Sequence, residues 1–456
     1  MAQMDIELFK KSINAMIAKN GASWDDFDGR WRRRHFTKEY TREEVERVLS
    51  STDPVALQTL SRSFFYKDGI YKRILIYYAT LLTYVGILIP NPIAGNELST
   101  PYVTKRYNNA LEYVDMMHLP ETLIKFSLGA LVDGCYYGVL QDVSKTKFVL
   151  LDLPFEYCRS NFKDLNGNDI IEFNVQYFDT IFDESARKQA LKVYPKVVSD
   201  HYNRYHRGTT TKYWVKIPTD LGFCFSFFDD SRPLFLDVIL AAIDYDDAVD
   251  VNKERDLEEI RKILVQKVPH LNDGTLLFEP DEAEVMHNGA VGMMKGNKNI
   301  SVLTTYADVD AVVSKTQSDA VTNTLEKALQ NVYARGSVSG QLFAPTGSQA
   351  LGTSITNDMS LMMILGNKYS RFISYIINSL FANSNVNFKY TILPVTWYNM
   401  FDYVTNTLKM ATSGYSFLLP TIAAGLSQKD LMNVKNLETN VLKLHELLIP
   451  LESSYT

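Results

Sequence analysis

Four aspartates in the middle of the chain form its densest group of carboxylates: Asp244, Asp246, Asp247 and Asp250. On a helix, Asp246 and Asp250 share one face because they are four residues apart. Paired carboxylates can hold the divalent cations of a nuclease if a Lys, a His or further acids converge on the same ions. No segment supplies such partners in a suitable spacing. The sequence therefore favours a solvated acidic helix face, and a metal-dependent nuclease is the alternative.

The usual signatures of catalysis and of nucleotide binding are missing. The sequence contains no GxxxxGK[ST], GxGxxG, HExxH or GxSxG motif. Its seven histidines are scattered, and His201 and His206 are badly spaced for one helix face in a region rich in strand patterns. We therefore expect no enzyme activity, no metal site and no cofactor.

The most unusual feature is a neutral segment, GSVSGQLFAPTGSQALGTSITN, from Gly336 to Asn357. Long loops inside compact domains are uncommon and usually functional. A catalytic loop normally carries ionisable groups, whereas hydroxyl and amide groups make weak, sequence-independent contacts with phosphates. This composition is typical of a loop that touches moving DNA without holding it. The predicted contact residues are Ser337, Ser339, Gln341, Thr346, Ser348, Gln349 and Thr353.

Helical patterns flank the neutral segment on both sides. Before it, apolar residues from Val321 to Val332 recur at helical spacing, and Gly336 is a natural C-terminal cap. After it, an apolar seam repeats every three or four residues, as in a coiled coil. The seam consists of Ile355, Met359, Met362, Gly366, Tyr369, Ile373, Ile376 and Leu380. Such a seam fits either a core helix within the chain or a helix contact between subunits.

A small insert precedes these helices. Pro233 opens a helix that is apolar early and acidic late, up to Ile260. Residues 261–313 then read as strand, helix and strand, which is too little chain for a core of its own. We therefore expect the insert to lean on a copy of itself. The predicted contact residues are Ile263, Val265, Val302 and Leu303.

The first half of the chain reads as a polar arm followed by an α+β region. The basic stretch Arg30–Arg47 predicts a solvated arm, with a surface for nucleic acid or an acidic partner as the alternative. From Ser61 to Pro90 the pattern is helical, and strands with a hairpin at Asn166 and Gly167 follow. The apolar run Ile74–Pro90 predicts a buried helix, because tyrosines and threonines dilute it. A membrane pore is the alternative. The predicted fold class is α+β, mainly helical.

Composition limits the partners and the compartment. The net charge is −6 and the pI about 5.7, which argues against coating nucleic acid by bulk electrostatics. The three cysteines, Cys135, Cys158 and Cys224, are odd in number and far apart. They predict a reducing compartment without disulfides. We see no secretory signal at the start of the sequence.

Several stretches, taken in order, resemble the portal (head-to-tail connector) proteins of tailed bacteriophages, especially those of phages with Gram-positive hosts. These stretches are LSRSFFYKDGIYKRILIYYATLLTY, MHNGAVGMMKGNKNISVLTTYADVDA, the neutral segment, LPVTWYN and the closing LIPLESSYT. The resemblance covers roughly Asp53 to Thr456. Its basis is the order of these stretches and the plan of helix, insert, helix, loop and helix.

The resemblance implies a division of the chain. After an N-terminal arm at 1–52, it assigns a wing to 53–230, stem helices to 231–260 and 314–336, a clip to 261–313, a tunnel loop to 337–354, and a return to the wing with crown-like C-terminal helices to 355–456. Asp246 and Asp250 would then line an acidic channel face. Two features depart from the family: no polar tail follows the closing SSYT, and the last helices are short for a tall crown.

The resemblance also implies a function. Family members form a dodecamer, a ring of twelve subunits, at one vertex of the capsid, and double-stranded DNA passes through it during DNA packaging and genome ejection. The implied partners are the large terminase, which hydrolyses ATP, a head-completion or adaptor protein, and the major capsid and scaffold proteins. The chain would be made in the host bacterial cytoplasm and end in the virion. The alternative is another virion or tail assembly protein without a DNA channel.

Overall fold

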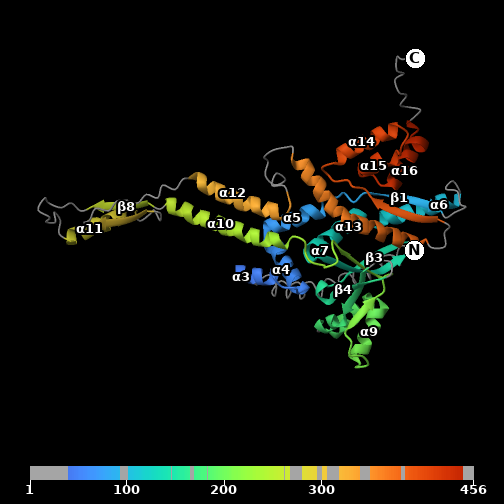
Figure 1. Cartoon of the computed structure of the whole chain (residues 1–456), viewed down its shortest axis with the longest axis horizontal. Helices are drawn as coiled ribbons and strands as arrows, with labels where there is room; N and C mark the ends of the chain where they lie inside the picture. Colours follow the sequence, from blue (N-terminus) through green and yellow to red (C-terminus); the bar gives the residue numbers. More distant parts are fainter. Residues whose placement is uncertain are drawn as a thin grey trace, which may run out of the picture. The chain divides into compact units, whose positions relative to one another are not determined.

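The computed structural model describes residues 40–92, 101–144, 146–164, 169–181, 183–260, 262–267, 280–294, 300–305, 318–338, 350–381 and 386–444. The structure is 63% helix and 16% strand, which confirms a mainly helical α+β fold. The chain divides into two compact units (Figure 1). Unit 1 comprises Met1–Ile239 and Gly336–Thr456, and unit 2 comprises Leu240–Arg335.

The described part of unit 1 opens with the helices α3 (Arg42–Leu49), α4 (Pro54–Lys67), α5 (Gly69–Ala79), α6 (Pro101–Met116) and α7 (Leu119–Asp133). Side chains cap the starts of the first three. The oxygens of Thr41, Asp53 and Asp68 accept backbone N–H groups in the first turns of α3, α4 and α5. Such caps satisfy N–H groups that have no partner within the helix.

The apolar run Ile74–Pro90 is not a single helix, so that prediction is wrong. Helix α5 ends at Ala79, and strand β1 (Gly86–Pro92) follows and pairs with β10 (Val386–Ile392). Two features turn the chain between them: the left-handed φ of 54° at Tyr84, and the bond from the Thr83 amide to the Val395 carbonyl. Pairing with a distant strand overrides the local helical pattern. No helix in the described part of the chain is long and apolar enough to span a membrane.

A three-stranded antiparallel sheet forms the centre of unit 1, in the order β3 (Lys147–Asp152), β2 (Cys135–Ser144) and β7 (Gly222–Ser226). Phe126 of α7 and Tyr369 of the long helix α13 (Ala350–Leu380) pack against Phe225 of this sheet, with ring centroids 4.7 to 5.3 Å from it. A disulfide joins Cys135 and Cys224 across β2 and β7. The prediction of a chain without disulfides is therefore wrong, because the sheet brings together two cysteines that are 89 residues apart.

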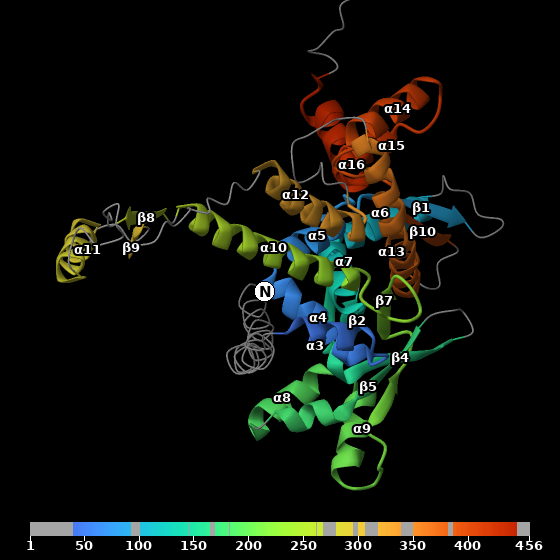
Figure 2. The ribbon, with the colours of Figure 1, turned by 60° about the vertical axis from the view of Figure 1, so that its left-hand side comes forward.

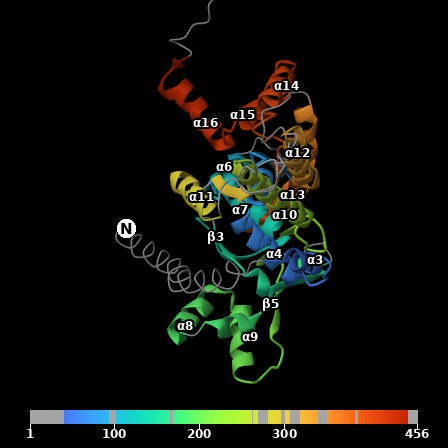
Figure 3. The ribbon, with the colours of Figure 1, turned by 90° about the vertical axis from the view of Figure 1, so that its left-hand side faces the viewer.

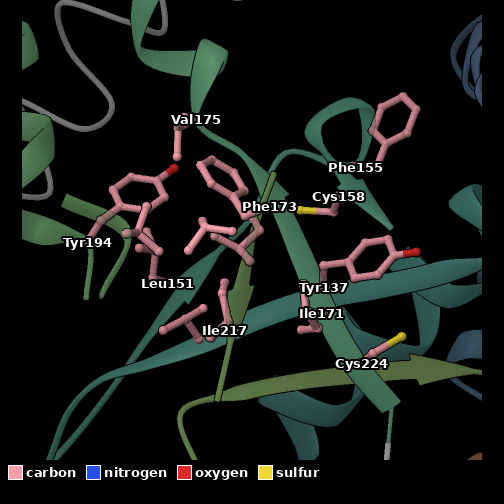
Figure 4. Packing of buried hydrophobic residues seen from close by; sticks show 14 of the residues in the cluster. Tyr137, Leu151, Phe155, Cys158, Ile171, Phe173, Val175, Tyr194, Ile217 and Cys224 are labelled. Carbon is pink, nitrogen blue, oxygen red and sulfur yellow. The ribbon is translucent and has the colours of Figure 1, made fainter. Parts of the chain in front are cut away.

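A second lobe of unit 1 shares a buried core with this sheet, to which Val139 of β2 and Leu151 of β3 contribute. It contains β4 (Cys158–Lys163), β5 (Asp169–Asn174), β6 (Trp214–Ile217), α8 (Glu184–Val193) and α9 (Lys196–His206), with 3₁₀ turns at Phe155–Tyr157 and Val175–Thr180. Phe173 and Tyr194 pack at its centre with their rings 5.4 Å apart (Figure 4). His201 and His206 lie on helix α9, within the region where the sequence shows mainly strand patterns.

Helix α13 supplies the apolar seam to the core of unit 1. Met362, Tyr369, Ile373 and Ile376 have no exposed surface, so at these positions the seam is a core within the chain. The remaining helices are α14 (Met400–Thr412), α15 (Leu418–Ala423) and α16 (Gln428–Asn436), followed by a π turn at Leu437–Val441. Figures 2 and 3 show α14 to α16 at one end of unit 1 and the lobe of α8 and α9 at the other.

Unit 2 is built from two long helices and a small strand pair. Its elements in chain order are α10 (Leu236–Ile260), β8 (Lys262–Lys267), α11 (Pro280–Met294), β9 (Ile300–Thr305) and α12 (Ser318–Arg335). Only the first four residues of α10 belong to unit 1. Strands β8 and β9 pair in parallel, and α10 and α12 run alongside each other (Figure 1).

Candidate nucleic-acid interface

The neutral segment is shorter as a loop than the sequence suggests. Helix α13 begins at Ala350, so Thr353 lies in a helix and its assignment to the loop is wrong. The apolar spacing of α13 continues one turn further back, since Leu351 precedes Ile355 by four residues. Ser337 lies just after α12. The other predicted contact residues lie outside the described part: Ser339, Gln341, Thr346, Ser348 and Gln349.

The start of the segment is anchored on helix α5. The Tyr78 hydroxyl lies 3.1 Å from the carbonyl oxygen of Gly336 and 3.3 Å from that of Ser337, and it can donate to either. Tyr78 is fully buried, and its ring stacks on Phe235 with centroids 4.6 Å apart. Ser337 has a left-handed φ of 51°, and Val338 is buried directly after it. The chain therefore leaves α12 along a path held by a buried hydroxyl and a buried apolar side chain.

The end of the segment is anchored on the same helix by a carboxylate. The hydroxyl of Tyr77 donates to Asp358 Oδ2 at 2.9 Å, and that of Tyr78 approaches Asp358 Oδ1 at 3.2 Å. Asp358 is only 4% exposed. Burial raises the pKa of its carboxyl above the usual value, and the two hydrogen bonds partly oppose that rise. Burial and the neighbouring carboxylate also raise the pKa of both tyrosines.

One tyrosine thus joins both ends of the neutral segment. Tyr78 contacts Gly336 and Ser337 at the start and Asp358 just beyond the end. We call Tyr77, Tyr78 and Asp358 the junction. The three residues of the junction do not stand out in the sequence, although two signals point to them. A tyrosine pair in an apolar run needs partners for its hydroxyls once buried. Asp358 is also the first charged residue after the segment.

The acidic helix face is solvated, as the sequence predicts. Asp246 and Asp250 are exposed on α10, and Asp250 pairs with Lys253 at 2.8 Å. Within the described ranges, no three His, Cys, Asp or Glu side chains are grouped so that they could hold a metal ion. Whether this face lines a channel stays a prediction.

The predicted contact residues of the insert lie on the paired strands. Ile263 and Val265 belong to β8, and Val302 and Leu303 belong to β9, with Val265 opposite Leu303. Among the described residues these strands form a sheet of two, so each strand has one edge without a strand partner there. Such edges can pair with another chain. Pairing with a second subunit stays a prediction.

Neither a protein-family model nor a curated protein matches this chain. The side chains described above, and the order of the elements that carry them, are therefore the basis for a functional proposal.

Proposed function

We propose that the chain is the subunit of a phage portal, a ring of about twelve copies at one capsid vertex that conducts double-stranded DNA. Large terminase and a head-completion or adaptor protein would dock on it, and major capsid and scaffold proteins would surround it. The protein would act as a conduit without catalysis of its own.

The observation that carries this proposal is the anchoring of the neutral segment. A segment without charge is unsuited to acid–base chemistry, yet both of its ends lie within hydrogen-bond distance of one buried tyrosine hydroxyl, and Tyr77 donates to Asp358 beside it. Buried polar groups with satisfied hydrogen bonds favour one arrangement of the backbone. Anchoring of this kind suits a segment whose position matters, such as a DNA-contacting loop.

The order of elements also supports the proposal. Helix α10, the strand–helix–strand insert, helix α12, the neutral segment and helix α13 follow one another along the chain. The plan of stem, clip, stem, tunnel loop and wing helix has the same order. Exposed carboxylates on α10 would repel phosphates and reduce sticking of DNA to a channel wall.

Two lysines in the neutral segment test the proposal. We expect Ser348→Lys with Gln349→Lys to leave ring assembly intact and to reduce the DNA packaged per procapsid. Each subunit adds two cations to one ring, and phosphate affinity rises steeply with the number of cationic contacts. The defect should weaken as salt rises, because salt screens the added charges. Native mass spectrometry monitors the ring in parallel.

A matched control carries the same charge elsewhere. Asn406→Lys with Asn433→Lys adds two lysines at exposed positions of α14 and α16 and should package normally.

If the protein is monomeric at every concentration, the portal proposal is wrong. If rings of the Ser348→Lys and Gln349→Lys variant package DNA normally at low salt, the neutral segment lies away from the DNA path. Rings without a through-hole in negative-stain images would favour a virion assembly protein without a channel.

A further inference from the structure

The part of the second lobe of unit 1 that runs from α8 through α9 to β6 carries a charge opposite to that of the whole chain. From Glu184 to Lys216 there are eight lysines and arginines and only two acids, a net charge of +6 within a chain of −6. Six of these cations are exposed on α8, α9 and the loop that follows, and one of them, Lys188, pairs with Glu184. We call the other five the basic face: Lys192, Lys196, Arg204, Arg207 and Lys212.

These cations are not used in ion pairs within the described part of the chain. None of the five has a carboxylate oxygen within 4.0 Å there, whereas Lys188 of the same lobe pairs with Glu184 at 2.7 Å. Asp200 is the acid on this side of α9, and it too makes no ion pair among the described residues. The face therefore keeps an excess of positive charge that is open to a partner.

Helix geometry brings three of the cations to one side of α9. Lys196 and Arg207 are eleven residues apart, which places them roughly 20° apart around the helix axis, and Arg204 follows at roughly 80° from Lys196. The buried residues Val198 and Tyr202 lie on the opposite side and pack into the lobe. The aligned cations span about 16 Å along the helix.

The loop after α9 is held in a defined path. The amides of Gly208 and Thr209 bond to the carbonyls of Tyr205 and Arg204 at 3.0 and 2.9 Å, and Gly208 has a φ of 73°. This is a Schellman cap, which requires a residue with positive φ. His201 Nε2 then bonds to the Lys212 carbonyl at 2.8 Å and ties the loop back to α9. Thr209 and Thr211 are exposed in this loop beside Lys212.

Helix stability does not explain the whole face. Arg204 and Arg207 lie at the C-terminal end of α9, where cations interact favourably with the helix dipole. Lys196, however, is the first residue of α9, where a positive charge is unfavourable. Since Lys196 also has no ion pair in the described part of the chain, its charge is better explained by an external anion.

We propose that the basic face binds the phosphate backbone of nucleic acid without sequence preference. Aligned Lys and Arg side chains supply the charge, and the threonine hydroxyls supply neutral donors, which are the groups that contact phosphates in protein–DNA interfaces. The span of about 16 Å matches roughly five phosphates along one strand. The face is separate in sequence from the neutral segment and does not require a ring.

Closed circular duplex DNA tests this proposal, because a closed circle cannot thread through a closed ring. Binding of the purified full-length protein is measured by gel shift over a salt series starting at 50 mM. We expect Lys196→Gln, Arg204→Gln and Arg207→Gln together to weaken binding by about tenfold or more. The slope of log affinity against log salt should lose about 3 units in magnitude, since each lost phosphate contact removes about 0.9.

A control variant removes the same charge elsewhere: Lys105→Gln, Lys389→Gln and Lys409→Gln, all exposed and outside the lobe. It should bind the circle as the wild type does, and both variants should unfold at the wild-type urea midpoint. The proposal is wrong if the two triple variants weaken binding equally. It is also wrong if polyglutamate competes with the DNA more strongly than inorganic polyphosphate does, because the face would then fit an acidic protein. A monomeric protein that still binds the circle through this face would contradict only the portal proposal.

Discussion

The junction and the insert differ in how they are held. At the junction, Tyr78 and Asp358 are buried among aromatic rings and share hydrogen bonds within one unit. The described part of the insert is a two-stranded parallel sheet with α11 packed against β9, and each strand has one edge without a strand partner there. The chain thus stabilises the ends of the neutral segment by itself, whereas the described strand edges of the insert can pair with another chain.

The largest effect is expected from a proline in the insert. Val265→Pro removes a backbone donor in the middle of β8, and proline is poorly tolerated inside a sheet. We expect loss of ring assembly or of adaptor docking, with little change in the unfolding of unit 1. Native mass spectrometry measures ring assembly, and a pull-down with the adaptor measures docking. Lys262→Pro, at the first residue of β8 where proline is tolerated, is the control. If the Val265→Pro variant forms rings and binds the adaptor as well as the wild type does, the insert is not an intersubunit contact.

A smaller effect is expected at the junction. Tyr78→Phe keeps the ring on Phe235 but removes a hydroxyl that can donate its one hydrogen to either of two carbonyls or to the Asp358 carboxylate. Buried groups left without a partner cost about 1–3 kcal/mol, so the free energy of unfolding should fall by that amount. Urea denaturation measures it. Tyr415→Phe, which changes an exposed tyrosine, should have no measurable effect. Equal stability of both variants would mean that the hydroxyl does not hold the segment.

The smallest expected effect is a change in how the free energy of unfolding depends on pH when Asp358 is replaced. Because burial raises the pKa of Asp358 in the folded state, the folded chain binds more protons than the unfolded chain just above the ordinary carboxyl pKa of about 3.9. The stability contribution of this group is therefore present below that value and is lost as pH rises through the raised pKa.

Asp358→Asn should remove this part of the profile. We expect its urea midpoint to fall less steeply than that of the wild type as pH rises from about 4 towards neutrality. The other buried acids are common to both proteins and cancel in the comparison. Parallel pH profiles for the two proteins would show that Asp358 does not titrate differently in the folded state.

Local patterns were sufficient to predict many elements. The seam residues predicted a helix that the structure extends over Ala350–Leu380, and the order strand, helix, strand of the insert follows from alternating and helical spacing. These features depend on neighbours within a few residues, so periodicity is enough to find them. The neutral composition from Gly336 to Asn357 is likewise visible in the sequence alone.

Other features were decided only by tertiary structure. Strand β1 ends the helical pattern after Ala79 because it pairs with β10, some three hundred residues later. Cys135 meets Cys224 because β2 and β7 are neighbours in a sheet. Tyr77 meets Asp358 across 281 residues, and the cations of α9 form one face because Val198 and Tyr202 turn the other side into the core. The sequence determines which groups need a buried or charged partner, but only the packing of distant segments decides which partner each one meets.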